Sequence, residues 1–215
     1  MTESRCIETH GRRAVQTLLL VSVLGGALLL AGCSIDKSIR VGSEAGDKSY
    51  RVIDGNLDVE SGYRIRGAKV IDGNLYLHEN SVVSGSVRVI DGNMRMRGGA
   101  RVGGGVQVVD GDLHAEEGSI ISGDFEMQHG TLDLRGLTIE GDVEIYCTGG
   151  NLFSTRIGGV FRIRKRALWY PECAAGRNVT IHPGSEVGKL VIETEEVTVR
   201  LEEGAVIHEI VRPGD

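Results

Sequence analysis

The segment Asp72-Gly73-Asn74-Leu75-Tyr76-Leu77 decides the fold, because near-copies of its first four residues recur along the chain. The final apolar residues of successive copies lie 18, 19, 19, 19 and 20 positions apart, and the other copies are Asp54-Gly55-Asn56-Leu57, Asp91-Gly92-Asn93-Met94, Asp110-Gly111-Asp112-Leu113, His129-Gly130-Thr131-Leu132 and Gly149-Gly150-Asn151-Leu152. A short repeat of nearly constant period is typical of a solenoid, in which each repeat forms one turn.

Apolar residues alternate with polar ones after each copy, which predicts short strands. These pairs are Leu57/Val59, Leu75/Leu77, Met94/Met96, Leu113/Ala115 and Leu132/Leu134. Each repeat then adds one apolar residue (Ile65, Val83, Val102, Ile121, Ile139) and a second alternating pair (Ala68/Val70, Val87/Val89, Val106/Val108, Phe125/Met127, Val143/Ile145). Three short strands per repeat predict an all-β, three-faced β-solenoid (β-helix) over residues 51–215, with about nine coils of 18–20 residues.

The composition agrees with this architecture and excludes several others. Of 215 residues, 32 are glycine, only 3 are proline and only 9 are aromatic, which suits a narrow aliphatic core with tight corners and excludes collagen. The hydrophobic share of 40% is too high for a disordered chain. With 24 Lys+Arg against 30 Asp+Glu, the net charge of -6 argues against a nucleic-acid partner.

The N-terminus has the pattern of a secretion signal. An apolar run from Leu18 to Leu30 follows Arg12 and Arg13, and it is shorter than the roughly 20 residues that span a bilayer. The run Leu30-Ala31-Gly32-Cys33 resembles the lipobox of bacterial lipoproteins. The alternative is a plain signal peptide or an uncleaved anchor with a chance cysteine.

The lipobox resemblance implies that residues 1–32 are removed and that Cys33 carries diacylglycerol on sulfur and an acylated amino group. We therefore expect residues 33–50 to form a lipidated tether and an N-terminal cap. Ser34 follows the cysteine where aspartate would retain the protein at the inner membrane. The expected location is the outer membrane, facing the periplasm.

Two cysteines remain in the mature body, Cys147 and Cys173. An oxidising periplasm permits a disulfide between them, and the alternative is two buried free thiols. The repeat is interrupted at about residues 165–177, which we interpret as a loop insertion tied back to Cys147.

Polar residues also recur in columns. Corner aspartates at Asp54, Asp72, Asp91 and Asp110 are interpreted as turn residues, with a line of calcium ions as the alternative. The column Asn56, Asn74, Asn93, Asp112 predicts an amide ladder. On the outer surface, the column Glu60, His78, Arg97, Glu116, Arg135 predicts ion pairs between coils.

The candidate binding residues form a basic cluster followed by two aromatic residues: Arg162, Arg164, Lys165, Arg166, Trp169 and Tyr170. In an acidic protein such a cluster could hold an anionic envelope polymer, a glycan or lipopolysaccharide phosphates. The alternative is a solvated face and a self-packed loop. The sequence nominates no catalytic residue, metal site or cofactor, and we expect a protein that is not an enzyme.

Recurring triplets such as Gly55-Asn56-Leu57, Gly85-Ser86-Val87 and Gly123-Asp124-Phe125 resemble those of the bactofilins, and also those of adhesin head domains built from similar coils. The bactofilin resemblance implies a right-handed, three-sided β-helix that polymerises end to end without nucleotide. The last coil stays apolar at Val206, Ile207 and Ile210, with little sequence left for a cap. We therefore expect a lipid-anchored scaffold or spacer that self-associates through its ends, and the alternative is an adhesin or binding module acting through the Trp169 loop.

Overall fold

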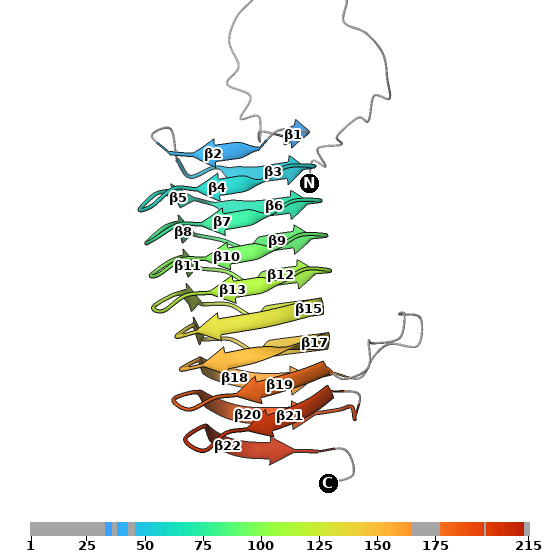
Figure 1. The fold of residues 1–215 in the computed structure, drawn as a ribbon. Helices are drawn as coiled ribbons and strands as arrows, with labels where there is room; N and C mark the ends of the chain where they lie inside the picture. Colours follow the sequence, from blue (N-terminus) through green and yellow to red (C-terminus); the bar gives the residue numbers. More distant parts are fainter. Residues whose placement is uncertain (1–32, 36–37, 43–45, 165–176, 196, 213–215) are drawn as a thin grey trace, which may run out of the picture.

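The computed structural model describes residues 33–35, 38–42, 46–164, 177–195 and 197–212, and every regular element among them is a β-strand. The strands stack in parallel along one axis, with β1 at one end and β22 at the other (Figure 1). This arrangement confirms the predicted all-β solenoid, which makes about eight turns where about nine were expected. Roughly 4.8 Å per turn gives a rod of about 40 Å.

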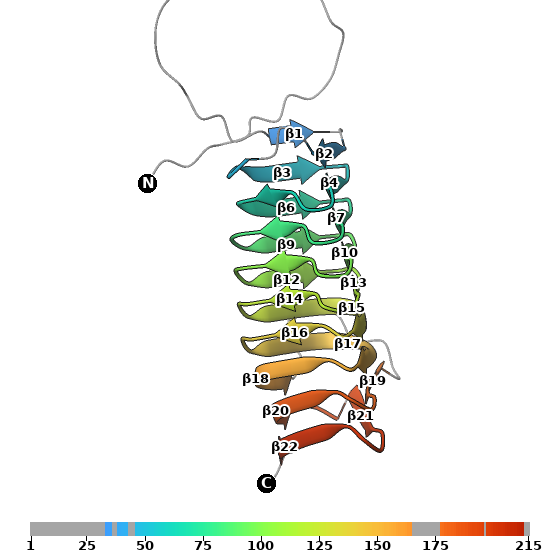
Figure 2. The same ribbon diagram turned by 90° about the vertical axis from the view of Figure 1, so that its left-hand side faces the viewer.

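Three stacks of strands run the length of the rod, and we call them the first, second and third faces in the order in which one turn visits them (Figures 1 and 2). The first face contains β1 (Cys33–Ile35), β3 (Ser49–Ile53), β6 (Gly67–Ile71), β9 (Val87–Ile90), β12 (Val106–Val109) and the first halves of β15 (Phe125–Arg135) and β17 (Val143–Phe153). It continues with the second halves of β18 (Arg156–Ile163), β20 (Glu186–Ile192) and β22 (Val206–Val211).

The second face contains β2 (Ile39–Val41), β4 (Leu57–Val59), β7 (Leu75–Leu77), β10 (Met94–Met96), β13 (Leu113–Ala115), the ends of β15 and β17, β19 (Arg177–Ile181) and β21 (Val197–Leu201). The third face contains β5 (Arg64–Ile65), β8 (Val82–Val83), β11 (Arg101–Val102), β14 (Ile120–Ile121), β16 (Thr138–Ile139) and the first halves of β18, β20 and β22.

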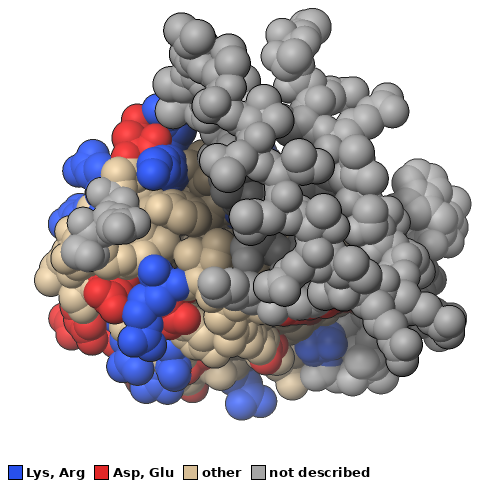
Figure 3. All heavy atoms as spheres, turned by 90° about the horizontal axis from the view of Figure 1, so that it is seen from above, with Lys and Arg blue, Asp and Glu red and all other residues tan. Residues whose placement is uncertain are grey.

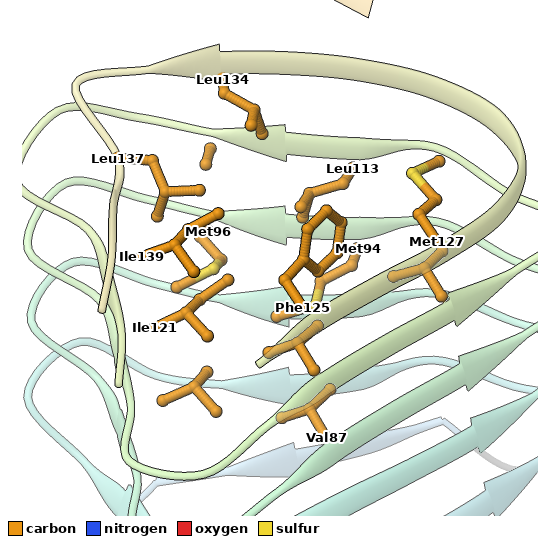
Figure 4. Close-up of a cluster of buried hydrophobic side chains, with 14 of the residues drawn as sticks. Val87, Met94, Met96, Leu113, Ile121, Phe125, Met127, Leu134, Leu137 and Ile139 are labelled. Carbon is orange, nitrogen blue, oxygen red and sulfur yellow. The ribbon is translucent and has the colours of Figure 1, made fainter. Parts of the chain in front are cut away.

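The register matches the repeat read from the sequence. Leu75 pairs with Leu57 on one side and Met94 on the other, and Val83 lies between Ile65 and Val102 in the same way. All of these residues are buried, with relative exposures of 0–1%. Figure 4 shows Met94 with three other core residues, Leu113, Phe125 and Ile121, pointing into the interior from different faces. Like residues stack on like, so the core is one continuous column of aliphatic side chains.

The Asp-Gly-Asn triplets form the corner between the first and second faces. Asp54, Asp72, Asp91 and Asp110 have φ of 51–53°, and His129 and Cys147 take the same left-handed conformation in the next two turns. Aspartate tolerates this region better than most residues, which supports the interpretation of the column as turn residues.

The stack begins earlier than the sequence indicated. Within residues 33–50, expected as tether and cap, β1 pairs with β3 and β2 pairs with β4. Of the insertion expected at about residues 165–177, residues 165–176 lie outside the described residues, and Arg177 is the first residue of β19. β18 ends at Ile163 and β19 resumes in register, with Val179 beside Gly150.

Candidate functional site on the first face

The predicted basic cluster is only partly described, and its described members are paired with carboxylates. Arg162 Nη1 lies 2.7 Å from Asp142 Oδ2 and 3.7 Å from Glu144 Oε1. Arg164 lies 3.9 Å from Glu144 Oε2 through Nε and 3.4 Å from Glu193 Oε1 through Nη1. The other predicted members of the binding cluster lie outside the described residues: Lys165, Arg166, Trp169 and Tyr170. Two of its six members therefore have their charge compensated locally.

Asp142 anchors this ion-pair network. Its Oδ1 accepts a 2.8 Å hydrogen bond from the backbone N–H of Val160, and its Oδ2 faces Arg162. The Val160 N–H and, after it, the Arg162 guanidinium lower the pKa of Asp142 below its usual 3.8. The same pairing raises the pKa of Arg162. The ion pairs of Arg162 with Asp142 and Glu144 thus link consecutive turns of the solenoid.

Cys147 is disulfide-bonded and 4% exposed. It occupies the corner column in the turn just before the expected insertion. Cys173, its expected partner, lies outside the described residues.

A second basic group lies on the same first face, nearer the N-terminal end, and we call it the basic ladder. It consists of Arg51, Lys69 and Arg88, which are direct neighbours in the parallel register of β3, β6 and β9. Among the described residues, no carboxylate lies within ion-pair distance of any of the three, and Arg51 Nε is buried without a hydrogen-bond partner. Figure 3, which looks along the axis from the N-terminal end, shows Lys and Arg side chains projecting from the outline of the coils.

The basic ladder carries an electrostatic cost. Like charges directly opposite one another in a sheet destabilise it. The pKa of Lys69 is lowered from 10.5 by partial burial and then by the neighbouring Arg51 and Arg88. Each of these effects disfavours the charged ammonium, and a bound anion would relieve the repulsion.

Farther along the rod, the same outward column changes sign. Gln107 follows Arg88 and donates a 3.0 Å hydrogen bond to Glu126, and Glu144 and Arg162 come next in register. A shallow groove crosses this region, lined by Arg88, Gln107, Glu126 and Glu144 together with small residues such as Ser86 and Gly105. Arg162 and Arg164 pair with Glu144, and the amides of Gln107 and Gln128 donate hydrogen bonds to Glu126. The basic ladder is therefore the run of neighbouring cations on the first face that has no ion-pair partner among the described residues.

An outward apolar column runs beside the basic ladder. Ile53, Ile71, Ile90 and Val109 are in register two positions after Arg51, Lys69, Arg88 and Gln107, and all four are half-buried. Alternation along a strand places residues two apart on the same side of the sheet. The N-terminal part of the first face therefore presents cations and β-branched aliphatic residues together.

The predicted lipidation site belongs to the same column. Cys33, the first residue of β1, is paired in register with Arg51, and Ile35 is paired with Ile53. In register, the column of the basic ladder therefore reaches the residue where the lipobox resemblance puts the acyl chains, and the apolar column reaches Ile35, two residues later.

The remaining predicted columns agree with the structure in part. The amide ladder is confirmed, because Asn74 N donates to Asn56 Oδ1 at 3.0 Å and Asn93 N donates to Asn74 Oδ1 at 3.0 Å. Arg97 pairs with Glu116 at 3.3 Å, as expected, whereas Arg135 pairs with Asp133 at 3.0 Å instead of with Glu116. In the described part of the chain, no group of three or more His, Cys, Asp or Glu residues is arranged to hold a metal ion.

Sequence reasoning missed the basic ladder although its signal was present. Arg51, Lys69 and Arg88 are 18 and 19 positions apart, the spacing of the repeat itself. The outward column predicted from the sequence lies on the strands that follow the Asp-Gly-Asn corners. The outward column on the other alternating strand contains three cations in a row.

Comparison with protein-family models, with curated proteins and with solved structures finds no match for this chain. Among the described residues, none forms a helix of the length and apolar character needed to cross a bilayer. The functional argument therefore depends on the geometry of the solenoid.

Proposed function

We propose that the protein is a non-enzymatic, lipid-anchored β-solenoid of the bacterial envelope that serves as a structural scaffold or spacer and assembles end to end. The observation that carries this proposal is the open C-terminal turn. Among the described strands, β21 pairs only with β19 and β22 only with β20. Their outer edges leave backbone donors and acceptors available to another strand.

The core is also uncovered at that turn. Leu201 and Ile210 are in register with the buried Ile181 and Leu190, yet they are 41% and 37% exposed. Such residues, together with unpaired edges, favour stacking of a second solenoid on this end. The lipobox resemblance supplies the membrane part of the proposal, with Cys33 as lipidation site and the periplasmic side of the outer membrane as location.

The alternative function, a binding module for a glycan or anionic envelope polymer at the basic cluster, has less support. Arg162 and Arg164 already form ion pairs with carboxylates of the protein, namely Asp142, Glu144 and Glu193. Pull-down with cell-wall and lipopolysaccharide fractions, comparing the wild type with Trp169→Ala, tests it directly.

Electron microscopy of the mature protein purified in detergent tests end-to-end assembly. We expect filaments whose lengths are multiples of about 40 Å, and isolated rods for the double variant Leu201→Lys/Ile210→Lys. Thr138→Lys is the control, because Thr138 lies on the half-buried outer side of β16 in the middle of the rod, away from the open C-terminal turn. Isolated rods of the wild type at high concentration, or filaments unaffected by the double variant, would exclude this assembly.

A further inference from the structure

Three features with a bearing on membranes converge on the N-terminal part of the first face. These are the register position of Cys33, the basic ladder Arg51–Lys69–Arg88 and the apolar column Ile53, Ile71, Ile90 and Val109. Each of the three features is placed on this stack of strands by its own register pairs. The second and third faces have no comparable run of three cations in register among their described strands.

We infer that the first face is a membrane-contacting surface, and that the solenoid lies along an anionic bilayer with the basic ladder on the lipid phosphates. The inference rests on the proposed acylation of Cys33. It goes beyond that proposal because acylation alone leaves the direction of the rod open. A rod standing on its N-terminal end and a rod lying on its first face both keep Cys33 at the membrane.

The distance between the anchor and the basic ladder favours the lying orientation. β1 begins at Cys33 itself, so no linker separates the acylated residue from the fold. Neighbouring strands are about 4.8 Å apart, which puts the Arg51 backbone about one strand spacing from the anchor and Arg88 about three. Three cations held this close to the headgroups meet the negative surface potential of an anionic leaflet within its screening length.

The charge distribution identifies the ligand as a surface of phosphates. The ladder is uncompensated in a chain of net charge -6, so its cations are not explained by attraction to the rest of the protein. Partial burial and, after it, repulsion by Arg51 and Arg88 lower the pKa of Lys69, and anionic phosphates would offset the repulsion. The half-buried aliphatic column beside the ladder suits the boundary between headgroups and acyl chains, where surface helices likewise combine a basic and an apolar stripe.

The two orientations differ in thickness. Lying flat, the protein layer has the width of one face, which for a five-residue strand such as β3 is about 17 Å, or about 20 Å with side chains. Standing upright, it has the length of the rod, about 40 Å. Neutron reflectometry of the acylated protein reconstituted into supported bilayers measures this thickness directly.

We expect a thin layer on bilayers that contain phosphatidylglycerol, and an approximately twofold thicker layer on pure phosphatidylcholine or at high salt. The triple variant Arg51→Gln/Lys69→Gln/Arg88→Gln should give the thick layer on both bilayers. The matched control, Arg64→Gln/Arg95→Gln/Arg101→Gln, changes the net charge equally on the other two faces and should behave as wild type. Circular dichroism checks that both variants are folded.

A thick wild-type layer on phosphatidylglycerol overturns the inference, and so does a thin layer that persists in the basic-ladder variant. The wild-type comparison between the two lipids needs no substitution, so it decides the matter even if a variant fails to fold. Mass spectrometry of the N-terminal peptide reports separately on the acylation of Cys33. An unmodified cysteine would contradict the proposed function, whereas a modified one with a thick layer would contradict only the lying orientation.

Discussion

Gly92 illustrates why glycine fills the corner column of the repeat. A Cβ atom at this position would lie 1.7 Å from the carbonyl oxygen of Gly73 in the preceding turn, and the same clash recurs at Gly73, Gly111 and Gly130 with distances of 1.7–1.8 Å. The neighbouring atoms are backbone, so the turns themselves would have to separate.

We therefore expect Gly92→Ala to lower the free energy of unfolding by at least about 3 kcal/mol. Gly98→Ala is the control from the same turn, because the nearest atom to its Cβ would be the Glu117 carbonyl oxygen at 3.4 Å. Its effect should stay within about 0.5 kcal/mol. Urea denaturation of both variants measures the difference, and equal stabilities would show that the turns can shift apart at little cost.

Asp142 gives a pH-dependent prediction. Its pKa lies below the unfolded value of 3.8, so the charged carboxylate stabilises the fold above that pH, and this contribution is lost as the pH falls through the lowered pKa. Asp142→Asn keeps an acceptor for Val160 but loses the ion pair with Arg162. At pH 7 we expect a loss of about 1 kcal/mol, the upper end for exposed pairs.

Melting temperatures of wild type and Asp142→Asn, measured from pH 7 downward, test this assignment. The gap between them should hold to about pH 4 and then close, because other carboxylates titrate in both proteins and cancel. A gap that persists at lower pH would mean that the substitution acts through packing.

Individual polar contacts were only partly predictable at the residue scale. The ion pair between Arg97 and Glu116 follows from the register alone, and it is present. The register predicts that Arg135 pairs with Glu116, but Arg135 instead pairs with Asp133, two positions earlier on the same side of the same strand. Its guanidinium carbon also lies 5.0 Å from the centre of the Phe153 ring. The repeat predicts which side chains are neighbours in successive turns. It does not predict whether a residue on the same strand takes the ion pair instead.

The amide ladder runs along the corner between the first and second faces and links successive turns. Asn74 Oδ1 accepts hydrogen bonds from Asn93 N and Asn93 Nδ2, at 3.0 and 3.1 Å, so each side chain bonds the turn that follows it. Asn74→Ala should destabilise the protein by about 0.5–1.5 kcal/mol, because it removes exposed hydrogen bonds that hold the next turn, and water replaces them only in part.

Asn74→Asp should cost clearly less than Asn74→Ala, since a carboxylate oxygen still accepts from Asn93. The chain itself uses this variant at Asp112, whose Oδ1 accepts from Thr131 N at 2.9 Å. Free energies of unfolding for the two variants provide the test. Equal losses would mean that the stack of side-chain amides, and not the acceptor, provides the stability.

At the scale of the elements, the period of the apolar residues was enough to predict the strands and their register. Leu75 beside Met94 and Val83 beside Val102 follow from spacing, because every turn must bury the same face. β1 and β2 were missed because no Asp-Gly-Asn triplet precedes them and polar residues surround them. Their pairing depends on β3 and β4, which supply a preformed edge.

The whole molecule connects orientation with assembly. If the rod stood on the membrane, its N-terminal end would face the lipid, and head-to-tail stacking onto the open turn at Leu201 and Ile210 could not continue. If it lies on its first face, both ends point along the membrane plane. The proposed membrane-contacting face and the open C-terminal turn can therefore be used at the same time, with a filament growing along the bilayer.

This combination leads to a prediction that neither surface makes alone. On bilayers containing phosphatidylglycerol, electron microscopy should show in-plane filaments for the wild type and for the Arg64/Arg95/Arg101 control. The Arg51→Gln/Lys69→Gln/Arg88→Gln variant should lose these filaments but still form them in detergent solution, where orientation is irrelevant. Leu201→Lys/Ile210→Lys should lose them in both settings because the stacking surface is gone. Filaments of the basic-ladder variant on the bilayer at wild-type density would show that assembly is independent of the first face, and would leave the open C-terminal turn as the only determinant of growth.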